Sequence, residues 1–162
     1  MKVFLSYAVR DWDAPIAARL RAVAAAYDIA ILLPIRTPVV QNGITADTLT
    51  KIKQSDAVIA LVTNTAPRHL GNVVNLECQA AAQAGKPIIA LIEQGVTLQS
   101  AVPGSVVYFD RLNPTAHESS LMNALQQIRN QQQWKKDLTA LGWIAGIALG
   151  LVALGEVLGN EK

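Results

Sequence analysis

Residues 57–92 decide the fold of this chain. Positions 57–63 read Ala-Val-Ile-Ala-Leu-Val-Thr and positions 87–92 read Pro-Ile-Ile-Ala-Leu-Ile, two short apolar runs typical of buried parallel strands. Between them, positions 73–84 read Val-Val-Asn-Leu-Glu-Cys-Gln-Ala-Ala-Ala-Gln-Ala, an alanine-rich window that predicts a helix. The Gly-Lys-Pro at 85–87 ends that helix. The whole stretch therefore predicts a strand–helix–strand unit.

One charged residue, Glu77, falls on the small-residue face of the expected helix. At helical spacing it shares this face with Val73, Ala80, Ala81 and Ala84. One interpretation is a charge on a solvated helix face, which is the common case for a single glutamate. The other is a partly buried carboxylate with a chemical role.

The composition narrows the class of protein. The chain has 162 residues, 51% of them apolar and 16% charged, which excludes a disordered chain and suits one domain with an appendage. The net charge of +2 is too small to indicate a nucleic-acid partner. His69 and His117 lie far apart in the sequence, so no metal site is expected. The single cysteine, Cys78, is interpreted as a small buried apolar residue rather than a nucleophile.

Alternating strands and helices continue on both sides of the central unit. Apolar periodicity predicts further strands at 2–7, 28–33 and 106–109, and helices at 12–26, 45–55 and 116–136. This order predicts an α/β, flavodoxin-like fold: a five-stranded parallel sheet with helices on both faces.

Ligands of such sheets bind beyond the carboxyl ends of the strands. The expected ends are the segments 6–11, 34–43, 63–71 and 92–94. The Glu77 helix opens from the third of these segments, which places Glu77 near a crevice that Ser6 and Tyr7 also approach. This placement favours the chemical interpretation of Glu77 over the solvated one.

A lone carboxylate suits one reaction class better than others. The sequence shows no Ser-His-Asp set and no second carboxylate at a recognisable spacing. Cleavage of a glycosidic bond to a base that is already a cation, as in a nicotinamide nucleotide, needs no general acid. A carboxylate can then bind the ribose hydroxyls and stabilise the oxocarbenium-like transition state.

Three segments of the first strand and the central unit form a recognisable set: Val-Phe-Leu-Ser-Tyr-Ala-Val-Arg-Asp at 3–11, Ser-Asp-Ala-Val-Ile-Ala-Leu-Val-Thr at 55–63 and Gly-Lys-Pro-Ile-Ile at 85–89. These segments resemble Toll/interleukin-1 receptor (TIR) domains. Glu77 falls where catalytic members carry their glutamate. Nucleoside 2-deoxyribosyltransferases share a related sheet and a catalytic glutamate, but the Phe-Leu-Ser-Tyr opening favours TIR.

The resemblance implies a set of site residues. Glu77 would be catalytic, no cofactor is expected, and NAD+ or a related nucleotide would be the substrate. The resemblance places the substrate against the end of the first strand and the loop after the second, which are represented by Ser6, Tyr7, Ala8, Arg10, Arg36, Asn42 and Gly43.

The C-terminal region predicts a membrane helix. Residues 139–155 carry no charge and span about 26 Å as a helix, and Lys135 and Lys136 precede them. A ridge of Gly142, Gly146 and Gly150 predicts helix self-association. We therefore expect a TIR domain at 1–134 in the cytoplasm and a single-pass inner-membrane helix at 135–162. The alternative is a helix buried in an oligomer or docked on its own domain.

Together these features predict a membrane-anchored TIR NAD+ glycohydrolase or ADP-ribosyl cyclase that acts in prokaryotic antiviral defence and is activated by clustering. The alternative is a non-catalytic TIR module that signals or assembles, with helices that oligomerise as a membrane effector. Val73 and Val74 stand where the family carries an aromatic residue, which favours the alternative, whereas Glu77 favours the enzyme.

Overall fold

A computed structural model describes residues 1–8, 13–35, 43–64, 68–96, 104–113 and 118–133. Five strands form one sheet, in which neighbouring strands are parallel and the order is β2-β1-β3-β4-β5. This is the flavodoxin-like order, so the predicted fold class is confirmed. The strands are β1 (Lys2–Ser6), β2 (Ala30–Leu32), β3 (Ala57–Val62), β4 (Ile88–Glu93) and β5 (Ser105–Phe109).

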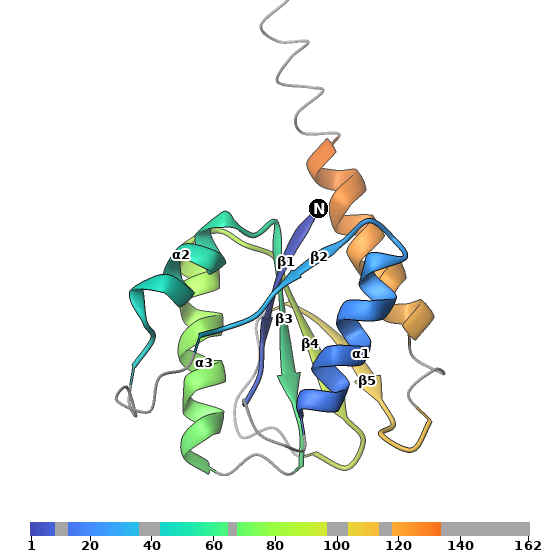
Figure 1. The fold of residues 1–162 in the computed structure, drawn as a ribbon, viewed down its shortest axis with the longest axis horizontal. Helices are drawn as coiled ribbons and strands as arrows, with labels where there is room; N and C mark the ends of the chain where they lie inside the picture. Colours follow the sequence, from blue (N-terminus) through green and yellow to red (C-terminus); the bar gives the residue numbers. More distant parts are fainter. Residues whose placement is uncertain (9–12, 36–42, 65–67, 97–103, 114–117, 134–162) are drawn as a thin grey trace, which may run out of the picture. The chain divides into compact units, whose positions relative to one another are not determined.

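The helices form two layers, one on each face of the sheet (Figure 1). On one face lie α2 (Ala46–Gln54) and α3 (Arg68–Gln83), which contact each other and β1. On the other face lie α1 (Ala14–Ala25) and the helical residues 118–126. Residues 1–126 form one compact unit, and residues 127–133 continue as helix in a second unit. The domain boundary predicted at residue 134 stays a prediction.

Small residues let α3 approach the sheet closely. Val74, Cys78 and Ala81 of α3 belong to one buried cluster with β-strand residues that include Phe4 and Ala60. The helix begins at Arg68, five residues earlier than expected from the sequence. Its first turn reads Arg-His-Leu-Gly-Asn and carries no apolar period, so hydrophobic periodicity could not detect it.

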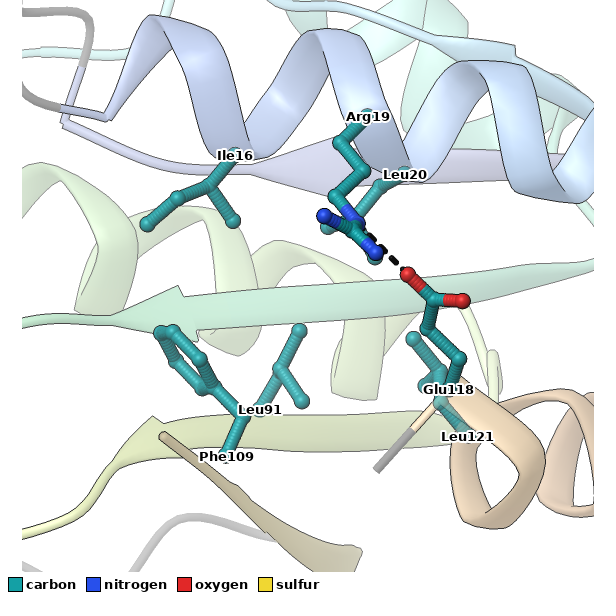
Figure 2. A pocket seen from close by; sticks show the side chains of 7 residues that line it. All are labelled: Ile16, Arg19, Leu20, Leu91, Phe109, Glu118 and Leu121. Atoms are coloured by element: carbon teal, nitrogen blue, oxygen red, sulfur yellow. Dashed lines mark hydrogen bonds and ion pairs between the residues drawn. The ribbon is translucent and has the colours of Figure 1, made fainter. Parts of the chain in front are cut away.

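The opposite layer is apolar with an ion pair at its edge (Figure 2). Leu20 of α1, Leu91 of β4, Phe109 of β5 and Leu121 line a small pocket there, together with Ile16. At its rim, Arg19 Nε lies 2.6 Å from Glu118 Oε1. This pair is partly exposed, so it adds little to stability.

The predicted membrane location is corrected. A helix that spans a bilayer needs about 20 apolar residues, whereas the 16 residues of α3 span about 24 Å and include several polar ones. Among the residues described, no helix is both long and apolar enough to cross a membrane. The inner-membrane assignment is therefore not retained. Residues 139–155 and the glycine ridge of Gly142, Gly146 and Gly150 lie outside the described residues, and the predicted self-association is unsupported.

Candidate functional site at the end of β1

Ser6 ends β1 at the carboxyl edge of the sheet, where its neighbour on β3 is Ala60. Side chains alternate between the two faces of a strand, so Ser6 shares the α3 face with the buried Phe4. Ala60 is small, which leaves room beside the serine hydroxyl. A polar side chain thus lies under α3 at the edge where ligands of this fold bind.

Glu77 of α3 is fully buried above this position. The interpretation of Glu77 as a solvated helix charge is therefore wrong. The Ser6 hydroxyl donates a 2.5 Å hydrogen bond to Glu77 Oε2, across 71 residues of sequence. The bond holds one oxygen of the carboxylate in a defined place.

Burial and order make this carboxylate chemically useful. An ionised group costs several kcal/mol to bury unless hydrogen bonds or charges compensate it. A carboxylate that is held away from bulk water interacts more strongly with a developing positive charge than one in water does. A negative charge on Glu77 would therefore interact strongly with a cation held beside it.

The other predicted site residues divide into two groups. Tyr7 and Ala8 follow Ser6 directly and are buried, and Gly43 is part-buried three residues before α2 begins. The structure brings Ser6 and Glu77 together. The remaining predicted residues, Arg10, Arg36 and Asn42, lie outside the described part of the chain.

Cys78 is unsuited to nucleophilic chemistry. Its side chain lies in the buried cluster beneath α3. Burial, and then the negative charge of Glu77, raise the pKa of the Cys78 thiol to about 11. The reactive thiolate is therefore scarce at neutral pH. This agrees with its interpretation as a small apolar core residue.

Two buried polar residues at the same edge were not among the predicted site residues, although Thr63 begins the expected strand-end segment 63–71. Asp13 and Thr63 are 2% and 5% exposed, yet neither belongs to an apolar pattern. The available signal was position, because Thr63 directly follows β3 and Asp13 directly precedes α1. Polar residues at the strand ends of a parallel sheet are candidates for a site on that ground alone.

We expect Ser6→Ala to lower the free energy of unfolding by about 1–3 kcal/mol, because it removes a donor from a buried carboxylate. Ser55→Ala is the matched control. Ser55 is equally buried, but its hydroxyl donates to the Ile52 carbonyl, a neutral acceptor that also receives the Ser55 N–H. Chemical denaturation of both variants measures the difference. A loss for Ser6→Ala no larger than that for Ser55→Ala would mean that the Ser6 hydroxyl does not stabilise the buried Glu77 side chain.

The solved structures that this chain matches include two proteins named for nucleoside or nucleotide chemistry. A 2-deoxyribosyltransferase from Bacillus psychrosaccharolyticus matches with a TM-score of 0.53 and 17% identity, over 71% of this chain and 90% of that one. The CMP N-glycosidase BcmB of Clostridium botulinum matches with a TM-score of 0.51 and 18% identity, over 78% and 99%. The chain shares their fold. No family model and no curated protein matches its sequence.

These neighbours correct the predicted family. The chain was expected to be a TIR protein, but the structures that it resembles are a deoxyribosyltransferase and an N-glycosidase. The Phe-Leu-Ser-Tyr motif misled because it describes a buried parallel strand that ends in polar residues, which is general to doubly wound sheets. The membrane-anchored TIR NAD+ glycohydrolase or cyclase is therefore not retained. The alternative TIR assembly module rested on the same motif and is dropped with it.

Proposed function

We propose that this chain is an enzyme that breaks the N-glycosidic bond of a nucleoside or nucleotide, with Glu77 as its catalytic carboxylate. The observation that carries the proposal is the fully buried Glu77 with the Ser6 hydroxyl 2.5 Å from Oε2. The two fold neighbours, a 2-deoxyribosyltransferase and a CMP N-glycosidase, support the same reaction class.

The chemistry follows from the geometry of one carboxylate. As the bond between C1′ and the base nitrogen breaks, its electron pair leaves with the base and positive charge develops on C1′ and the ring oxygen. The Glu77 carboxylate stabilises this charge, or one of its oxygens attacks C1′ to form a glycosyl ester. Water then attacks C1′ to give the free sugar, or a second base attacks to give a new nucleoside. A neutral base takes up a proton from solvent as it leaves, and the attacking water or second base returns a proton to solvent. A cationic base leaves without taking up a proton.

The residues around Glu77 have supporting roles in this proposal. Ser6 orients the carboxylate, and the buried Tyr7 and Ala8 form the wall of the site at the end of β1. Arg10, Arg36, Asn42 and Gly43 remain candidates for contact with the substrate. Because Glu77 has no exposed surface in this structure, substrate reaches it only when covering residues move. Closure over the substrate then excludes water and strengthens the charge stabilisation.

Release of free base tests the proposal. The purified chain is incubated with 2′-deoxynucleosides, with nucleoside monophosphates that include CMP, and with NAD+, and the bases are separated by chromatography. Each reaction is run with and without a second base, because a new nucleoside indicates transfer and a free sugar indicates hydrolysis. We expect base release from at least one substrate class, and its loss in Glu77→Gln. Absence of release from every class would exclude the proposed function.

A further inference from the structure

Four polar side chains form a ring at the carboxyl edge of the sheet, on the face opposite Glu77. Thr63 follows β3, Glu93 ends β4, Arg111 lies two residues beyond β5, and Asp13 precedes α1. Thr63, Glu93 and Arg111 continue the alternation of strand residues that face α1, such as Leu91 and Phe109. We call Asp13, Thr63, Glu93 and Arg111 the edge ring.

Asp13 makes the least expected contact in the ring. It occupies the N-cap position of α1, where an aspartate usually accepts a hydrogen bond from its own helix, but its side chain makes no capping bond. Instead its Oδ1 accepts a 3.0 Å hydrogen bond from the Thr63 hydroxyl and lies 3.6 Å from Arg111 Nη2. The Asp13 carboxylate therefore makes no hydrogen bond to its own helix and instead joins α1 to the end of β3.

Arg111 and Glu93 close the ring. Arg111 donates from Nε to Glu93 Oε1 at 2.7 Å and from Nη2 to Glu93 Oε2 at 3.0 Å, a two-pronged pairing. Glu93 Oε2 also accepts a 3.0 Å hydrogen bond from the backbone N–H of Asn64. The bond from Arg111 lowers the pKa of Glu93, which keeps the pair charged at neutral pH. The contacts therefore run from Asp13 through Thr63 and Asn64 to Glu93, and through Arg111 back to Asp13.

Stability alone is a poor explanation of this arrangement. Well-packed apolar residues commonly stabilise a buried position as well as an ion pair does, and an aspartate that caps its helix contributes about 1 kcal/mol. What the ring provides is a fixed distance between the start of α1 and the end of β3. The ring holds Asp13, which ends the β1–α1 connection, against Thr63, which starts the β3–α3 connection. The first connection follows Ser6, and the second leads to α3, the helix that carries Glu77.

We propose that the edge ring positions the catalytic site, with Thr63 and Asp13 as positioning residues for Ser6 and Glu77. This inference rests on the proposed function, because it assigns the ring a part in N-glycosidic cleavage. Fixing both connections from the opposite face of the sheet keeps the Ser6–Glu77 pair aligned while the site opens and closes. A misplacement of about 1 Å costs about a hundredfold in rate for a well-oriented reaction.

The test compares Thr63→Val, which removes the hydroxyl at nearly constant shape, with Thr63→Ser, which keeps it. We expect Thr63→Val to lower kcat about tenfold on the preferred substrate with KM changed less than about threefold, and Thr63→Ser to stay within about twofold of wild type. Arg19→Gln is the matched control on α1, since it breaks an ion pair outside the ring. A kcat for Thr63→Val within about twofold of wild type would overturn the inference.

Hydrogen exchange separates failure of the inference from failure of the proposed function. If wild type is active and Glu77→Gln is not, but Thr63→Val is normal, only the ring's role fails. If wild type releases no base, the proposed function is wrong, and hydrogen exchange still tests whether the ring fixes the two connections. In that test, Thr63→Val should speed amide exchange at Ala8 and Asn64 about tenfold. Thr63→Ser and Arg19→Gln should leave both amides unchanged. Unchanged exchange in Thr63→Val would overturn the ring as a clamp on the two connections.

Discussion

Glu77→Gln is expected to slow base release by about a hundredfold to a thousandfold, while the protein stays folded. The amide keeps the size of the side chain and an oxygen that accepts the Ser6 hydrogen bond, so the packing of α3 is preserved. What disappears is the negative charge opposite the developing cation. Loss of a group that stabilises transition-state charge in a buried site costs about 2.7–4 kcal/mol, which corresponds to a factor of about 100 to 1,000 in rate.

The measurement is kcat for base release, with the melting temperature as a check on folding. Glu118→Gln is the control, because Glu118 also forms a hydrogen bond but lies at the α1 face with Arg19. We expect it to retain wild-type kcat. Glu77→Asp is a further probe, since it keeps the charge and withdraws it by one methylene, and an intermediate rate is expected. Full activity in Glu77→Gln would show that the Glu77 carboxylate is not needed for the reaction.

The sheet was predictable from the sequence because its central strands, β1, β3 and β4, are buried on both faces. Such strands are short continuous apolar runs, as at 57–62 and 88–92, whereas the helices between them carry apolar residues at helical spacing. The sequence singled out Glu77 for a related reason: a lone carboxylate on a helix face of small residues conflicts with the pattern around it. Conflicts between local pattern and residue type are typical of functional sites.

The edge ring could not be predicted in the same way. Its bonds join residues as far apart in the sequence as Asp13 and Arg111, and no local period reports which polar side chains meet at a sheet edge. Asp13 was hidden further because the helix predicted at 12–26 included it, whereas in the structure it precedes α1 and its side chain makes no capping bond. The family assignment failed for the opposite reason. A short motif that encodes a buried strand end was taken as specific to one family.

Gly104→Ala is expected to lower the free energy of unfolding by about 3 kcal/mol or more, a large loss for the addition of a single methyl group. Gly104 precedes β5 with φ at +112°, a backbone conformation that side chains with a Cβ rarely adopt. A Cβ at this position would lie 2.0 Å from the Ile88 carbonyl oxygen and 2.8 Å from its carbon. Both are backbone atoms at the start of β4, so the clash cannot be relieved by rotating a side chain.

Gly85→Ala is the matched control, because Gly85 also has positive φ, at +65°, but nothing lies within 4 Å of its added Cβ. Only the left-handed conformation is penalised there, by about 1–2 kcal/mol. Chemical denaturation should therefore rank Gly104→Ala well below Gly85→Ala, and the melting temperature of Gly104→Ala should fall by roughly 6–12 °C. Equal losses in the two variants would mean that β5 moves away from β4 without cost. That result would be incompatible with the β4–β5 register, in which Ile89 pairs with Ser105, the residue directly after Gly104.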